Sequence, residues 1–189
     1  MTTIVRNRVA ALAALGAGSG TLGTFGLGVG YGEAPHLGLH MVLTGLWFGL
    51  VVAFGIWRWG SRSLAAAVTS LLGTCIGWEV AVNLALQISE NWLKPAGTSE
   101  LLRMSVAGFA AGAVGAFLTW TGAAAVAGSL RERAVAGSVV ATGAFFGLLL
   151  PLTSHYDNPI VLLLPWQTAV AAVIGLGLAP RHDALQNKN

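Results

Sequence analysis

Charged residues are almost absent from six long apolar stretches of this chain, and this distribution limits its fold more than any other feature. The 189 residues include ten Lys or Arg and seven Asp or Glu, and all of them except Glu79 lie between the apolar stretches or at their ends. The chain is 55% hydrophobic and only 9% charged, whereas a soluble domain carries about 25% charged residues. The chain therefore needs lipid or partner proteins as its solvent, which indicates an integral membrane protein.

The apolar stretches have the length of membrane-spanning helices, since crossing about 30 Å of hydrocarbon at 1.5 Å per residue takes about 20 residues. They are continuously apolar, which favours helices over the alternating pattern of a β-barrel. Ser61 or Ser63 can cap the third helix, Ser99 the fourth, and Asp157 or Asn158 the sixth. We predict an all-α, polytopic membrane protein in which all 189 residues form a single membrane domain. Six transmembrane helices are expected at about residues 9–30, 37–57, 64–88, 101–127, 134–153 and 160–179.

The basic residues gather on one side of the predicted membrane, and only Lys94 and Arg103 fall on the other. Because Lys and Arg are enriched in cytoplasmic loops, we expect a multi-pass protein of a cell or inner membrane with both termini in the cytoplasm. The basic, Ala-rich start also resembles a signal peptide, whose removal would leave the other spans oriented as before. The residues that share one side are Arg6, Arg8, Arg58, Arg62, Arg131, Arg133, Arg181 and Lys188.

Short matches between the two halves of the chain predict an internal repeat. Residues 42–50 and 140–148 are identical at six of nine positions, and the pattern Trp-Glu-x-Ala-Val at 78–82 is matched by Trp-Gln-x-Ala-Val at 166–170. Two halves of three helices would have opposite orientation, and such 3+3 inverted repeats recur in transporters. Chance is the other interpretation, because Gly, Ala, Leu and Phe dominate every membrane helix.

Small residues recur at helical spacing in two of the predicted spans. Gly16 and Gly20 form one small-xxx-small pair, and Gly108 and Gly112 form another. Such pairs let helix backbones approach closely in lipid, so they indicate tight packing within one bundle, or an interface with a second copy or with other membrane subunits. The net charge of +3 comes from short loops and not from a basic face, so no nucleic-acid partner is expected.

A polar stripe on the third predicted helix contains the candidate binding residues. Glu79, Asn83 and Gln87 are spaced four apart and share one helical face with Glu90. A carboxylate within hydrocarbon costs at least roughly 2.5–3.5 kcal/mol, so one that is kept usually has a function. On other helices, residues at matching depth extend the predicted pocket, which would open to the outer side. These residues are Thr44 and His40 on the second helix and Gln167 on the sixth.

A metal site is a weaker hypothesis. His36 and His40 lie one helical turn apart, and Glu90 or Asp157 would complete a coordination shell. Most such His pairs at a helix start are interfacial polar residues, so no metal and no cofactor is assigned. The sequence contains no nucleophile motif, no phosphate-binding loop and no HExxH, and an enzyme is not favoured.

The polar stripe leads to two hypotheses about function. The first is a small membrane channel or transporter for a small solute or cation, with an outward-facing polar pocket around Glu79. The second is a non-catalytic accessory or assembly subunit of a larger membrane complex. It is motivated by the short loops and the glycine-rich first helix.

Overall fold

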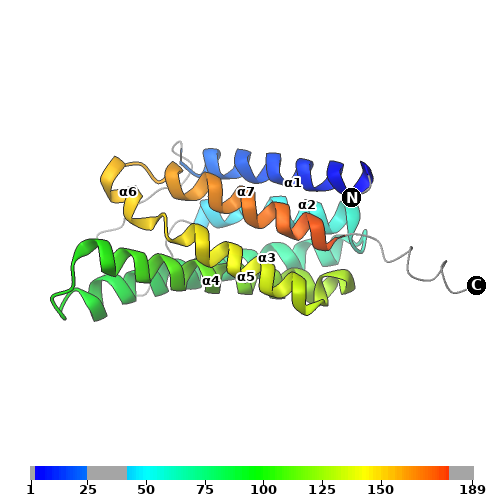
Figure 1. Cartoon of the computed structure of the whole chain (residues 1–189). Coiled ribbons are helices and arrows are strands. Elements are labelled where there is room, and N and C mark those ends of the chain that lie inside the picture. Colours follow the sequence, from blue (N-terminus) through cyan, green and yellow to red (C-terminus); the bar gives the residue numbers. More distant parts are fainter. Residues whose placement is uncertain (1–2, 25–41, 179–189) are drawn as a thin grey trace, which may run out of the picture.

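The computed structural model describes residues 3–24 and 42–178, and every regular element in these two ranges is a helix. Figure 1 shows the helices running side by side in an elongated bundle. The prediction of an all-α protein is therefore confirmed for the described residues. The elements are α1 (Thr3–Leu22), α2 (Val42–Trp59), α3 (Leu64–Leu86), the π-helix η1 (Gln87–Leu93), α4 (Glu100–Val126), the 3₁₀-helix η2 (Gly128–Arg131), α5 (Arg133–Gly147), α6 (Leu150–Tyr156) and α7 (Ile160–Gly177).

Five stretches of the described chain are long and apolar enough to cross a membrane, and they coincide with the second to sixth predicted spans. The first predicted span, residues 9–30, is not among them, and its last six residues lie outside the described residues. Helix α1 begins at Thr3 and ends at Leu22, and it includes Arg6 and Arg8. The described chain is that of a multi-pass membrane protein, and a sixth span is not confirmed. The five stretches are Val42–Trp59, Leu64–Leu93, Glu100–Val126, Arg133–Tyr156 and Ile160–Gly177.

Local side-chain caps fix several helix ends. Ser63 accepts a hydrogen bond from the backbone N–H of Ala66 at the start of α3, and Ser99 accepts one from Leu102 at the start of α4. At the start of α7, Asn158 Oδ1 accepts a hydrogen bond of 2.9 Å from the backbone N–H of Ile160. These bonds satisfy donors that a helix start leaves without an intrahelical partner.

The basic ends of several helices meet at one end of the bundle. The side chain of Arg8 is buried, and its guanidinium donates a hydrogen bond to the carbonyl of Leu178, directly after α7, at 2.8 Å. A cation is stabilised there because helix C-termini carry partial negative charge. The side chains of Leu12 and Leu178 also pack beside Gly55, close to the end of α2. Arg58 ends α2 and Arg133 begins α5, so these basic residues share an end as predicted, while the side of the membrane stays a prediction.

An aromatic group forms the centre of the core. The rings of Phe48 and Trp166 meet edge to face at 5.5 Å between centroids, and those of Trp78 and Trp166 at 6.0 Å. These three residues come from α2, α3 and α7, so the group ties three helices together. Edge-to-face pairs of this kind add stability beyond the area they bury.

Both predicted small-xxx-small pairs are used in packing within the bundle. A Cβ atom on Gly16 would lie 2.6 Å from the carbonyl oxygen of Gln167, so α1 packs directly against the backbone of α7. A Cβ atom on Gly112 would overlap the carbonyl oxygen of Gly143, so α4 packs against α5. In a 3+3 repeat, α1 and α4 would be equivalent. Helix α1 packs on α7 and α2, and α4 packs on α3 and α5, which these repeat positions allow, but the inverted repeat is not confirmed.

Candidate functional site

A cavity of about 430 Å³ lies between α3, α4, α6 and α7. On α3 its lining extends from Trp78 to Ser89, which corresponds to about 16 Å along the helix axis at 1.5 Å per residue. The lining is mostly apolar or small, and its polar residues are few. The wall that α3 supplies consists of Trp78, Ala81, Val82, Ala85 and Leu86, with Ser89 contributed by η1.

The cavity exists because small residues and a helix break leave space beside α4. Gly108, Gly112 and Gly115 of α4 line it without side chains. Helix α5 ends at Gly147, and Pro151 opens α6, where proline is tolerated because the first helical turn lacks intrahelical N–H partners. Figure 1 shows α6 crossing from the level of α5 to that of α7 at the end of the bundle away from the N-terminus.

Two tryptophans form the deep wall. Trp166 is buried, and its indole N–H donates to the carbonyl of Gly143 on α5 at 3.0 Å, which fixes the ring. Trp78 packs against it and lies beside Gly45 of α2, where a Cβ atom would come within 2.9 Å of the Trp78 side chain. The deep end of the cavity is therefore rigid and aromatic.

The rim of the cavity is polar and accessible. Ser154 and Asp157 are exposed, and Thr153 is half-buried. Asp157 has a left-handed backbone, with φ of 48°, and its N–H donates to the carbonyl of Thr153 at the end of α6. Of the described residues that line the cavity, Asp157 is the only charged one. A bound molecule would meet one carboxylate at the rim and an apolar interior.

The predicted polar stripe lies on another face of α3. Glu79, Asn83 and Gln87 are half-buried, and none of them lines the cavity. Successive residues of a helix are about 100° apart around its axis, so these three positions lie on average roughly 120° from Trp78 and Val82. Asn83 donates to the backbone carbonyl of Glu79 at 2.8 Å, and Gln87 accepts from Asn91 at 2.7 Å. These amides are thus bonded within their own helix.

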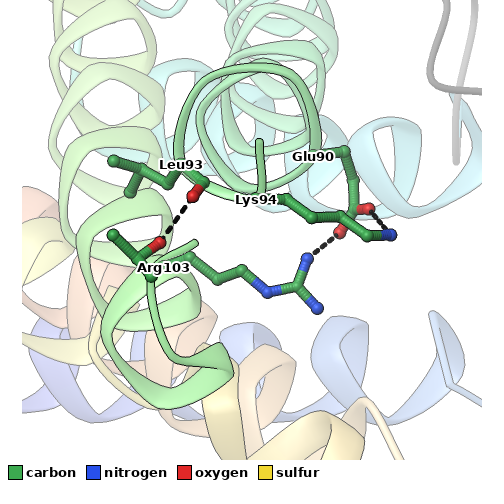
Figure 2. A network of polar contacts seen from close by, with 5 residues as sticks. Glu90, Leu93, Lys94 and Arg103 are labelled. Atoms are coloured by element: carbon green, nitrogen blue, oxygen red, sulfur yellow. Dashed lines mark hydrogen bonds and ion pairs between the residues drawn. The ribbon is translucent and has the colours of Figure 1, made fainter. Parts of the chain in front are cut away.

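Glu90 binds two cations where η1 approaches α4. Its carboxylate oxygens accept hydrogen bonds from Lys94 Nζ and Arg103 Nη1, both at 2.6 Å (Figure 2). The hydroxyl of Thr98 donates to the carbonyl of Leu93 in the same turn. Glu90 therefore holds the junction between η1 and α4.

Thr44 and Gln167 are fully buried on the side of the bundle that faces α1. Gln167 Oε1 accepts a short hydrogen bond from the hydroxyl of Ser19. Thr44 lies beside Gly23, one turn after Ser19 on α1. Gln167 Nε2 and Thr44 Oγ1 have no hydrogen-bond partner among the described residues. The sequence did not single out Ser19; its only signal is a hydroxyl within the run of small residues.

The metal hypothesis gains no support from the described residues. In residues 3–24 and 42–178, no three His, Cys, Asp or Glu side chains come together. Glu90 is engaged by Lys94 and Arg103, and Asp157 lies at the cavity rim. The other candidates, His36 and His40, lie outside the described residues, as does the predicted role of His40 in solute binding.

Comparisons with known proteins do not add a family to these observations. No family model, no curated protein and no solved structure matches this chain. The structure defines a multi-pass helical membrane protein with the cavity described above, whose interior is apolar and whose rim is polar.

Proposed function

We propose that the protein is a small membrane channel or transporter that takes up a small solute in the cavity between α3, α4, α6 and α7. The observation that carries this proposal is the cavity of about 430 Å³ inside a bundle of membrane-spanning length. Protein interiors leave few voids larger than a water molecule, whereas ligand pockets measure about 300–1,000 Å³ and combine an apolar lining with a few polar groups. The dimensions and the lining support a binding site.

The orientation in this proposal follows from the arginines. Arg8, Arg58 and Arg133 lie at one end of the bundle, and the positive-inside rule assigns this end, with both termini, to the cytoplasm. The cavity rim at Asp157 lies at the opposite end, after α6. The solute would therefore enter from the external side.

The polar stripe has a second role in the proposal. Glu79 directly follows Trp78, which lines the cavity, so a change of charge or hydrogen bonding at Glu79 acts on the cavity wall. We assign to Glu79 the cation or proton whose movement accompanies transport, with Asn83 and Gln87 as neutral partners on the same face. Thr44 and Gln167 supply buried polar groups on the α1 side of the same core.

The test is solute flux in proteoliposomes that contain the purified full chain. Ala85→Phe places a large side chain in the cavity wall and is expected to abolish flux. Ala65→Phe makes the same change at an exposed position on α3 and should leave flux unchanged. Glu79→Gln should abolish or uncouple flux. Flux that is insensitive to both Ala85→Phe and Glu79→Gln would contradict the proposal and would favour the alternative, an accessory or assembly subunit.

A further inference from the structure

The charge of the cavity lining bears on the kind of solute that fits. Asp157 is the only charged residue among the described residues that line the cavity, and it lies at the exposed rim. A lone carboxylate attracts a cation and repels an anion. The remaining rim groups are the hydroxyls of Thr153 and Ser154, which accept hydrogen bonds from a charged donor as well.

The carboxylate of Asp157 is available for a ligand. The Lys and Arg side chains that the described residues supply at this end of the bundle are Lys94 and Arg103, and both are bound to Glu90 (Figure 2). The neighbouring Asn158 side chain is occupied by the backbone N–H of Ile160. No described residue forms an ion pair with Asp157, so its charge is balanced by solvent or by a bound cation.

The interior of the cavity favours an apolar or aromatic body. The deep wall consists of Trp78 and Trp166, whose rings meet edge to face, and Val82, Leu86 and Leu163 flank them. Flat or bulky apolar groups pack well against such rings, and cations are also attracted to them. The cavity lining extends about 16 Å along the helix axis from Trp78 to Ser89, at 1.5 Å per residue, which matches an elongated molecule with one charged end.

We infer that the cavity takes amphipathic organic cations, with an amine or quaternary ammonium head at Asp157 and an apolar or aromatic body against Trp78 and Trp166. This inference rests on the proposed function and names its substrate class. Neutral solutes of the same shape bind less well because they gain nothing from the carboxylate. Anions bind least, because Asp157 repels them and no basic residue is present among the described lining residues.

The backbone conformation of Asp157 allows its charge to be removed without disturbing the turn. Asp157 has a φ of 48°, a left-handed conformation that Asn adopts as readily as Asp. Asp157→Asn therefore removes the charge and keeps the turn between α6 and α7. The matched control is Glu100→Gln, which removes an exposed carboxylate at the start of α4 that does not line the cavity.

The experiment is calorimetric titration of the purified full chain in nanodiscs with two isosteric elongated probes, (6-phenylhexyl)trimethylammonium and its neutral carbon analogue 2,2-dimethyl-8-phenyloctane. Protein carrying Ala85→Phe supplies the background from the lipid. The cation should bind more tightly than the neutral probe, and Asp157→Asn should weaken cation binding about two- to fivefold, as expected for an exposed ion pair, without changing the binding of the neutral probe. The difference should shrink at high salt, and Glu100→Gln should bind as the unmodified protein does.

Two contrary results have different meanings. If the neutral probe binds as tightly as the cation, or if Asp157→Asn binds the cation unchanged, the inference about cations is overturned while the cavity remains a solute site. If neither probe binds above the Ala85→Phe background, the cavity is not a solute site of this kind, and the proposed function is lost together with the inference.

Discussion

The helix pairs α1–α7 and α4–α5 both depend on a small-xxx-small pair, yet they are held together differently. Between α4 and α5, glycines of the two helices face each other. Gly108 of α4 lies against Gly147 of α5, and Gly112 of α4 lies against Gly143 of α5. Between α1 and α7, glycines do not face each other: Gly16 of α1 meets the backbone of Gln167 and Gly175 of α7 meets the backbone of Val9. Side-chain hydrogen bonds join these two helices as well. The bonds are Ser19 to Gln167 and Arg8 to the carbonyl of Leu178.

This difference teaches that the same motif has two uses. The α4–α5 contact is almost purely backbone packing, and α4's glycines also leave the space that becomes the cavity. The α1–α7 contact combines packing with buried polar groups on the opposite side of the bundle. The free energy of unfolding should therefore depend on glycine most strongly at the α4–α5 contact. At the α1–α7 contact it should also depend on the polar contacts, each to a different extent.

The largest effect is expected for Gly112→Val. Any Cβ atom at this position overlaps the carbonyl oxygen of Gly143, and backbone cannot move aside as a flexible side chain does. We expect a loss of about 3 kcal/mol or more in the free energy of unfolding, measured by denaturant titration in detergent. Gly137→Val on α5, where a Cβ atom meets nothing within 4 Å, is the control. Equal stability of the two variants would show that α4 and α5 do not pack as described.

A smaller loss is expected for Gly16→Val on α1. The added Cβ atom would lie 2.6 Å from the carbonyl oxygen of Gln167, a smaller overlap than that of Gly112 with Gly143. We expect about 2 kcal/mol in the same titration. Gly18→Val is the control, since a Cβ atom there has no neighbour within 4 Å. A loss larger than that of Gly112→Val would reverse the ranking of the two contacts.

Arg8→Met should cost about 1–2 kcal/mol, because it removes a charge-assisted hydrogen bond to the C-terminal end of α7 while keeping much of the apolar stem. Thermal unfolding followed by circular dichroism measures the change. Arg6→Met, at an exposed position two residues earlier on α1, should have little effect. Equal shifts for both variants would indicate a general effect of charge and not the contact with Leu178.

The smallest effect is expected for Ser19→Ala. The variant loses the bond to Gln167, and hydrogen bonds between membrane helices are worth about 0.6 kcal/mol on average. Ser138→Ala, at an exposed position on α5, serves as the control in the same thermal assay. A loss above that of Arg8→Met would mean that the buried polar group at Gln167, and not packing, dominates the α1–α7 contact.

Helix positions were predicted well where a local signal marks the end. The expected starts of the third, fourth and sixth spans lie within one residue of α3, α4 and α7, because Ser63, Ser99 and Asn158 cap them. The change to a π-helix at η1 has no such local signal and was not predicted. The first predicted span, residues 9–30, is not confirmed, because it extends beyond the described residues; helix α1 itself begins earlier, at Thr3, and apolar length alone does not show where a helix begins.

The candidate site was predictable only in part. Polar residues stand out in an apolar sequence, so Glu79, Thr44 and Gln167 were found. Which of them meet depends on helix packing, and the structure places Gln167 against α1 and Glu79 on another face of α3. The cavity lining was missed because the alanines and glycines that form it look the same as those that pack tightly. Asp157 was named as a possible helix cap and as a weak metal candidate.

Helix α6 gives the cavity a wall of low local stability. Each of the other described α-helices contributes buried residues, whereas α6 contributes none, and a break at Leu148–Leu149 separates it from α5. Segments with few buried contacts open with small free energies, independently of global unfolding. The amide hydrogens of α6 should therefore exchange with solvent earlier than those of α3 or α4, and the mouth of the cavity can widen while the rest of the bundle stays folded.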